Sequence, residues 1–201
     1  MMMAMRRSAI TFAVLLLCPL IYGHAQDQDA STPPPPATPK KAPSEPTLPR
    51  GVILPLKTVK ESFPAVTQQL DTGPDTVATP KPTISRLTVY ASRDGVNKVT
   101  LTVDEYQYGS EASLAYEQAA QKTQLPDFEP IAIANVGQRV FGGTLKQGGE
   151  TQILIVVLED RIVVGAVLSG FDNTTDNISK LAELMRLQVA DLHIRPSSRK
   201  R

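Results

Sequence analysis

Few side chains in this sequence have the chemistry of a nucleophile or a metal ligand. Cys18 is the only cysteine, and the two histidines are His24 and His193. Zinc sites combine several cysteine, histidine or acidic ligands, and catalysis by a cysteine–histidine pair needs a thiolate. Both kinds of site are therefore nearly excluded, and a single cysteine leaves no intramolecular disulfide. We expect no metal and no cofactor.

Carboxylates are the remaining candidates for catalysis, namely Asp104, Glu105 and Asp127, and a Ser/Lys pair is the other option for a hydrolase. Nothing in the sequence pairs these acids across a cleft or adds a nucleophile–base pattern. Residues 172–177, DNTTDN, lack the spacing and the glycine of a calcium loop and are better explained as a helix cap. The two Gly–Gly pairs within residues 142–149 lack the helix that follows a phosphate-binding loop. We therefore predict that the protein is not an enzyme.

The chain begins with the parts of a secretory signal. Two arginines are followed by a short apolar run over residues 10–17, and small residues, Gly23 and Ala25, precede a cleavage site between Ala25 and Gln26. The apolar run is shorter than the roughly 20 residues that span a membrane as a helix. We predict a cleaved signal peptide over residues 1–25 and a secreted or periplasmic protein.

Two alternatives would keep the chain at a membrane. The run LLLC ends at Cys18 and resembles a bacterial lipoprotein signal, in which the cysteine is acylated after cleavage. Such signals have a small residue before the cysteine, and Leu17 is not small. In the second alternative the signal stays uncleaved and serves as an interfacial anchor. A membrane partner follows only from one of these two.

The stretch after the signal changes in character twice. Residues 26–55 contain many prolines and few large apolar side chains, which predicts a disordered Pro-rich spacer in extended polyproline II. Residues 56–82 predict a partly ordered linker with a short helix, interrupted at Pro64. This helix either docks on its own domain or is a peptide for a partner. Its apolar positions, spaced three and four apart, are Leu56, Val59, Phe63, Val66 and Leu70.

Alternating apolar and polar residues over 84–103 predict a β-hairpin. A three-residue turn at residues 93–95 places a glycine where positive φ is needed and pairs Val89 with Val99. A two-residue turn would instead pair Val89 with Thr100 and mix apolar with polar positions. We predict the first register. The predicted buried face then carries Leu87, Val89, Val99 and Leu101, and the predicted exposed face carries Thr88, Tyr90, Thr100 and Thr102.

Tyrosines carry the candidate binding site. Tyr106 and Tyr108 extend the exposed face of Tyr90 unless a bulge at residues 104–105 turns them inward. Tyrosine combines a large contact area with a polar tip and is enriched at interfaces. The three side chains therefore predict a recognition surface, with the alternative that one or more of the rings closes the core.

The rest of the pattern predicts two helices and an apolar hairpin. The first helix is capped by Ser110, and the second by Thr175 or a neighbouring Asn or Asp. Between them, a hairpin with its turn at residues 159–160 pairs Ile155 with Val164, and both of its faces are apolar, which places it centrally in the sheet. The first helix is expected to bury Leu114, Ala115 and Ala119. The second is expected to bury Ile178, Leu181, Leu184, Met185, Val189 and Leu192.

The element order predicts one small α+β domain over residues 83–195, with an antiparallel β-sheet and two helices, followed by a basic disordered tail over residues 196–201. This order is similar to that of PsbP/Mog1-like domains over roughly residues 83–192. A resemblance of this kind concerns the fold and carries no functional residue.

The function predicted from these features is a binding or interaction module. The chain has 21 basic and 20 acidic residues, so its charge indicates no nucleic acid partner. Signal and spacer predict an exported bacterial-type cell-envelope protein whose partner is another envelope protein or surface component, or a second copy in a homodimer. Two alternatives are a subunit of an envelope assembly that uses the apolar hairpin face, and a carboxylate- or Ser/Lys-based hydrolase.

Overall fold

The computed structural model describes residues 53–72, 80–147 and 149–194, all in one compact unit. The predicted signal peptide with Cys18, Ala25 and Gln26, most of the spacer, His193's side chain and the basic tail lie outside the described residues. The elements are α1 (Leu56–Ser62), β1 (Gln68–Thr72), β2 (Ile84–Ala91), β3 (Lys98–Glu105), α2 (Gly109–Ala120), the 3-10 helix η1 (Gln121–Gln124), β4 (Phe128–Pro130), β5 (Arg139–Gln147), β6 (Glu150–Glu159), β7 (Ile162–Ser169) and α3 (Thr175–Ile194).

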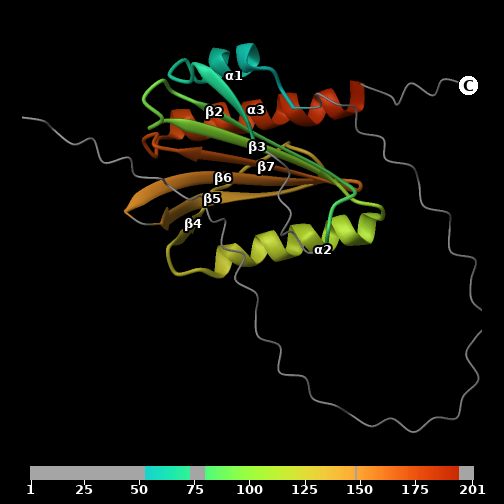
Figure 1. The fold of residues 1–201 in the computed structure, drawn as a ribbon. Helices are drawn as coiled ribbons and strands as arrows, with labels where there is room; N and C mark the ends of the chain where they lie inside the picture. Colours follow the sequence, from blue (N-terminus) through green and yellow to red (C-terminus); the bar gives the residue numbers. More distant parts are fainter. Residues whose placement is uncertain (1–52, 73–79, 148, 195–201) are drawn as a thin grey trace, which may run out of the picture. The chain divides into compact units, whose positions relative to one another are not determined.

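The described strands form one antiparallel seven-stranded sheet in the order β1-β2-β3-β7-β6-β5-β4. Helices α1 and α3 lie over one face, and α2 lies over the other (Figure 1). The α+β class and the antiparallel sheet are therefore confirmed, with the two helices expected in the domain, α2 and α3, and with α1 where a short helix was predicted in residues 56–82. The β6–β7 hairpin is central and has α3 on one face and α2 on the other, as its apolar faces predicted.

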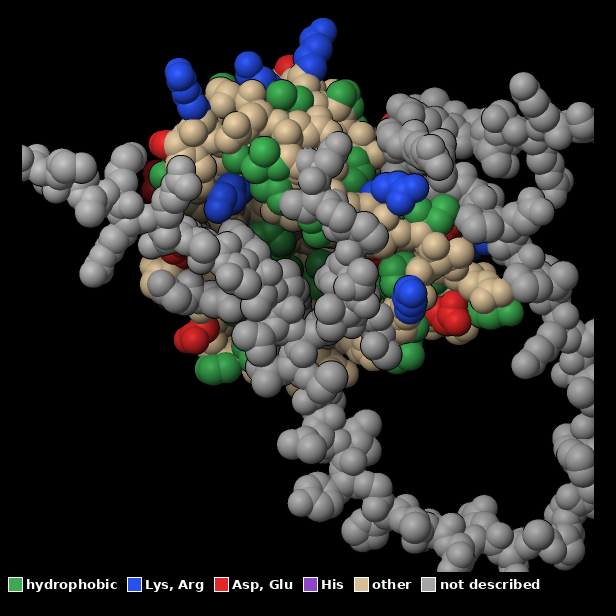
Figure 2. Space-filling model, viewed as in Figure 1, with side chains coloured by type: hydrophobic (Ala, Val, Ile, Leu, Met, Phe, Trp, Pro, Cys, Tyr) green, Lys and Arg blue, Asp and Glu red, His purple; other side chains and the backbone are tan. Residues whose placement is uncertain are grey.

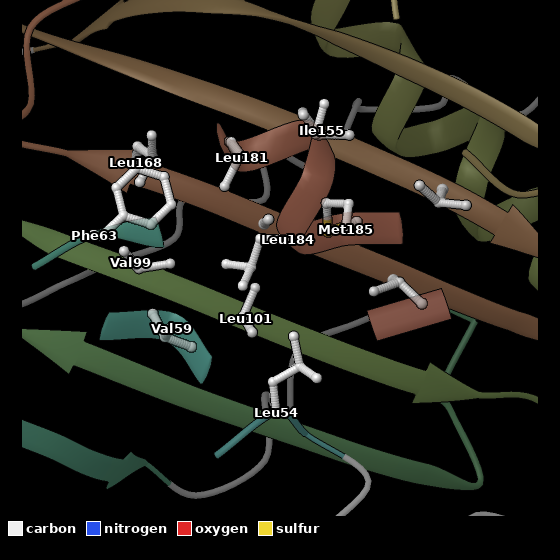
Figure 3. Close-up of a cluster of buried hydrophobic side chains, with 14 of the residues drawn as sticks. Leu54, Val59, Phe63, Val99, Leu101, Ile155, Leu168, Leu181, Leu184 and Met185 are labelled. Atoms are coloured by element: carbon white, nitrogen blue, oxygen red, sulfur yellow. The ribbon is translucent and has the colours of Figure 1, made fainter. Parts of the chain in front are cut away.

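Two hydrophobic cores hold the layers together. The main core lies between the sheet and the α1–α3 layer (Figure 3). A smaller core lies under α2. Fully buried members of the main core include Val59, Val66, Tyr90, Val99, Leu101, Val103, Ile155, Val157, Val164, Leu181, Leu184 and Met185. The smaller core contains Tyr106, Ala112, Tyr116, Leu158 and Val163. The predicted apolar stripe of α3 is confirmed, since its central members are buried against the sheet.

The predicted register of the first hairpin is wrong by one residue. Tyr90 pairs with Val99, and Val89 pairs with Thr100. Because successive side chains of a strand point to opposite faces, this slip moves Tyr90 into the main core and moves Val89 to the other face. The physical reason is distant in sequence: the Tyr90 hydroxyl donates a hydrogen bond to the Leu54 carbonyl oxygen inside the core. A buried tyrosine with a partner for its hydroxyl behaves as a core residue.

The second hairpin differs from its predicted register by two residues. Val157 pairs with Val164 and Ile155 with Ala166, so the turn lies at residues 160–161. Asp160 adopts a φ of 51°, which aspartate tolerates in tight turns. A shift of two residues leaves every side chain on its expected face, and for that reason the central position of the hairpin was still predicted correctly.

The ends of the helices also depart from the expected ones. Helix α2 begins two residues earlier than a Ser110 cap implies, at Gly109, and the Glu111 carboxylate accepts the Tyr108 backbone N–H at 3.3 Å. Its sheet-facing positions are therefore Ala112 and Tyr116, and the expectation of a buried Leu114 is wrong. Helix α3 is capped by the Thr174 hydroxyl, which accepts the Asn177 N–H at 3.2 Å, rather than by Thr175 or an Asn or Asp neighbour.

The segment expected to be a linker takes part in the sheet and in the main core. Helix α1 ends at Ser62, two residues before Pro64, and strand β1 pairs with β2. Val59 and Phe63 are buried in the main core. In this structure the folded part of the chain therefore begins before residue 83, where the alternating pattern starts.

Candidate binding surface

The three candidate tyrosines lie in different places. Tyr90 is fully buried in the main core, so its predicted exposure is wrong. Tyr106 is buried in the smaller core under α2. Strand β3 pairs regularly through Asp104 and Glu105, so the bulge alternative is wrong, and the alternative that a ring closes the core holds because α2 covers this face. Tyr108 precedes α2 and is 41% exposed. The structure therefore does not bring the three rings together on one polar surface, and Tyr108 alone stays a candidate contact residue.

A different surface follows from the strand register on the α2 side of the sheet. Leu70, Val89, Thr100 and Val167 are direct cross-strand partners in a row across β1, β2, β3 and β7. Partners directly opposite in an antiparallel pair share a face. A second row on the same face joins Leu87, Thr102 and Gly165. We call the six side chains Leu70, Leu87, Val89, Thr100, Thr102 and Val167 the open sheet face.

The open sheet face is accessible because α2 covers the other half of the sheet. Helix α2 packs on β6 and β7, and the Tyr116 ring contacts the Phe141 ring of β5 edge-on at 5.4 Å. Leu70 is 45% exposed and the other five side chains are half-buried. None of the six belongs to either hydrophobic core of the described residues. They form a contiguous patch, in contrast to single exposed apolar residues, which are common on any surface.

The open sheet face is apolar, carries the hydroxyls of Thr100 and Thr102, and has no charged side chain among its six members. A Cβ atom at Gly165 would lie 2.5 Å from the Thr102 hydroxyl oxygen, so only glycine leaves room for that side chain in the floor of the surface. The Thr102 hydroxyl donates to the Gly165 carbonyl oxygen at 3.4 Å. The open sheet face therefore suits an uncharged or weakly polar partner. On the side of the molecule drawn in Figure 2, Lys, Arg, Asp and Glu side chains are scattered among the hydrophobic ones.

Charged groups fix α2 in place at the far side of the sheet. Arg139 of β5 pairs with Glu117 of α2 at 2.5 Å and lies 4.6 Å from the centre of the Tyr116 ring. The hydrogen bond to Glu117 raises the pKa of the Arg139 guanidinium, and burial raises the pKa of the Tyr116 hydroxyl. These contacts hold α2 over β5–β7 and away from the open sheet face.

The candidate catalytic acids are not brought together. Glu105 is buried in an ion pair with Arg161 of the β6–β7 turn. Asp104 is its neighbour on β3, and neighbouring side chains of a strand point to opposite faces. Asp127 is exposed on the loop before β4. In the residues that the structure describes, no group of three His, Cys, Asp or Glu side chains is arranged to hold a metal ion.

The β6–β7 hairpin is covered on both faces over most of its length, and of its apolar side chains Val167 alone belongs to the open sheet face. Helices α2 and α3 of the same chain contact its two faces. The alternative of an assembly subunit that docks through this hairpin therefore loses the feature on which it depended. Sequence reasoning missed the open sheet face because Leu87 and Val89 were assigned to the interior. The signal that could have found it was the two-residue turn, which pairs Val89 with Thr100.

Comparisons with known proteins add little. No family model matches the chain, and no curated protein is similar to it in sequence. Among solved structures, the extracellular domain of PknH from Mycobacterium tuberculosis is similar with a TM-score of 0.44 and 9% identity, over 69% of this chain and 93% of that one. A likeness at this level does not establish a shared fold or function. Across the described ranges, no helix has the length and apolar character needed to cross a membrane.

Proposed function

We propose that the protein is an exported, non-enzymatic interaction module that binds a partner in the cell envelope through the open sheet face. The observation that carries this proposal is the contiguous row of Leu70, Val89, Thr100 and Val167 on the half of the sheet beside α2. Contiguous apolar patches with a polar rim mark interaction sites on soluble domains. The predicted export signal and the predicted Pro-rich spacer support the envelope as the place of binding.

The parts of the open sheet face have separate roles in this proposal. Leu70 and Val89 supply apolar area that a partner removes from water, at about 25 cal/mol per Å². The hydroxyls of Thr100 and Thr102 supply hydrogen bonds that orient the partner. The spacer of some thirty residues supplies reach, about 90 Å when it is fully extended as polyproline II.

Site-specific photo-crosslinking of the full chain in the cells that export it tests the proposal. A benzophenone amino acid replaces Thr100 on the open sheet face, and in a matched variant it replaces Lys180, which is exposed on α3 on the other side of the sheet. We expect a discrete intermolecular adduct from position 100 and none from position 180. Adding Thr102→Glu to the first variant should abolish the adduct, because it places a charge in the middle of the apolar surface.

The identity of the adduct decides between partners. An adduct with another envelope component, or with a second copy of this chain, supports the proposal. Only intramolecular crosslinks would mean that the chain covers its own sheet, and equal adducts from positions 100 and 180 would mean unspecific contact. Either result contradicts the proposal. So does the absence of any adduct from position 100.

A further inference from the structure

Two buried polar side chains form hydrogen bonds with the backbone of a single residue, Leu54, near the start of the described residues. The Leu54 N–H donates to Gln188 Oε1 at 3.1 Å, and the Leu54 carbonyl oxygen accepts a hydrogen bond from the Tyr90 hydroxyl. Gln188 belongs to α3 and Tyr90 to β2, and both side chains are fully buried. We call this arrangement the Leu54 clamp. It holds one residue from both sides by its main-chain atoms.

The residues that follow the clamp are packed into the main core. Residues 53–66, here called the strap, bury Leu54, Val59, Phe63 and Val66 against β2, β3 and α3 (Figure 3). The Phe63 ring lies edge-on to the Phe171 ring at 5.3 Å. Apolar contacts alone would hold the strap in the core.

The clamp therefore has a role beyond packing. Burying polar groups is unfavourable unless they are hydrogen-bonded, and their benefit is to fix the position of the groups they bind. Here they fix the main chain of Leu54 relative to two elements at once. The strap cannot slide along the core without breaking the hydrogen bonds of these fully buried side chains, which is costly.

The position of the clamp in the chain suits it to resist mechanical force. The Pro-rich residues end at Pro49, and Ile53 is the first described residue after them, so a pull on that segment reaches the strap at the end that the clamp holds. Helix α1, with seven residues, comes next, and helices this short have little stability of their own. We propose that the Leu54 clamp is an anchor, which passes a pull on the N-terminal segment directly into β2 and α3 and prevents α1 from being peeled away.

The proposal predicts how the full chain unfolds when it is pulled by its two ends in a single-molecule force experiment. With the clamp intact, the strap should be released together with the core in one cooperative step. Tyr90→Phe keeps the ring and removes the hydroxyl, and it should produce an earlier, low-force step in which the strap comes free. For residues 53–66 the extra length is about 50 Å. Tyr116→Phe, a matched removal of a hydroxyl in the smaller core, should leave the single step unchanged.

The outcomes separate anchoring from packing. An early step of about 50 Å in Tyr90→Phe and none in Tyr116→Phe supports the anchor. A wild-type chain that already releases the strap in its own low-force step would overturn it. An unchanged single step in Tyr90→Phe would do the same. If Tyr90→Phe does not fold, Gln188→Met removes the other half of the clamp at similar volume, and the same two results decide the question.

Discussion

Removal of Arg161 should be one of the most damaging single changes away from the cores. Its guanidinium pairs with Glu105, whose side chain is 1% exposed, whereas that of Arg161 is 20% exposed. Arg161→Met keeps the aliphatic stem and removes the cation of this pair from the buried Glu105 carboxylate. Breaking a buried ion pair in this way costs about 3–5 kcal/mol. With a urea m-value of about 2 kcal/mol per M, the unfolding midpoint should fall by roughly 2 M.

Urea denaturation at pH 7, followed by circular dichroism, measures this difference. The matched control is Lys146→Met, which removes an ion pair to Glu129 in which both side chains are about two-thirds exposed, and it should cost less than about 1 kcal/mol. The double variant Glu105→Leu/Arg161→Met removes both charges and should regain most of the lost stability. The reasoning is refuted if Arg161→Met is no more destabilising than Lys146→Met. A double variant as unstable as Arg161→Met would assign the loss to packing rather than to charge.

Further predictions concern other parts of the fold. Gly170 has a φ of +76°, and a Cβ there would lie 2.2 Å from a backbone oxygen. Gly95 has a similar φ of +74° but open space around it, so Gly95→Ala should lower the free energy of unfolding by about 1–2 kcal/mol. Gly170→Ala should lower the urea midpoint far more than Gly95→Ala does. Phe63→Ala should cost about 3–5 kcal/mol in the same assay, since the strap is part of the main core. The hydrogen bond from Ser92 lowers the pKa of Asp94 below 3.8. The ionised Asp94 therefore stabilises the fold at pH values above the ordinary aspartate pKa, and this stabilisation is lost as the pH falls through the lowered pKa. An NMR titration should show the Asp94 pKa rising in Ser92→Ala.

The features predicted best from sequence are those that local patterns specify. The stripe of α3, with Leu181 and Met185 at its centre, has the 3.6-residue period that only a one-sided helix explains. The β6–β7 hairpin is apolar on both faces over a length typical of strands, which fixes it at the centre of a covered sheet. In both cases a pattern within about twenty residues is enough to predict the element and its buried side, and tertiary packing agrees with that prediction.

The features missed depend on contacts between distant segments. The register of β2 and β3 follows the hydrogen bond of Tyr90 to Leu54, which is 36 residues away in the chain. No alternation within residues 84–103 contains that partner, so the pattern favoured a tyrosine in water. Strand β1, Gln68–Thr72, carries one apolar residue and pairs on one side only among the described strands. Edge strands of this kind lack the alternation by which strands are identified.

The open sheet face can be understood from the widths of the elements. Strands are spaced about 4.8 Å apart, so a seven-stranded sheet is roughly 29 Å wide, whereas a helix is about 10–12 Å across. Helix α2 on its face can therefore cover two or three strands. Face assignment by alternation shows which residues share a side with α2, but non-local contacts such as the packing of Tyr116 on Phe141 decide over which strands the helix lies. Once those contacts place α2 over β5–β7, the α2 side of β1–β3 is left to Leu70, Val89 and Thr100, which form the surface through which the proposed function has a partner bind.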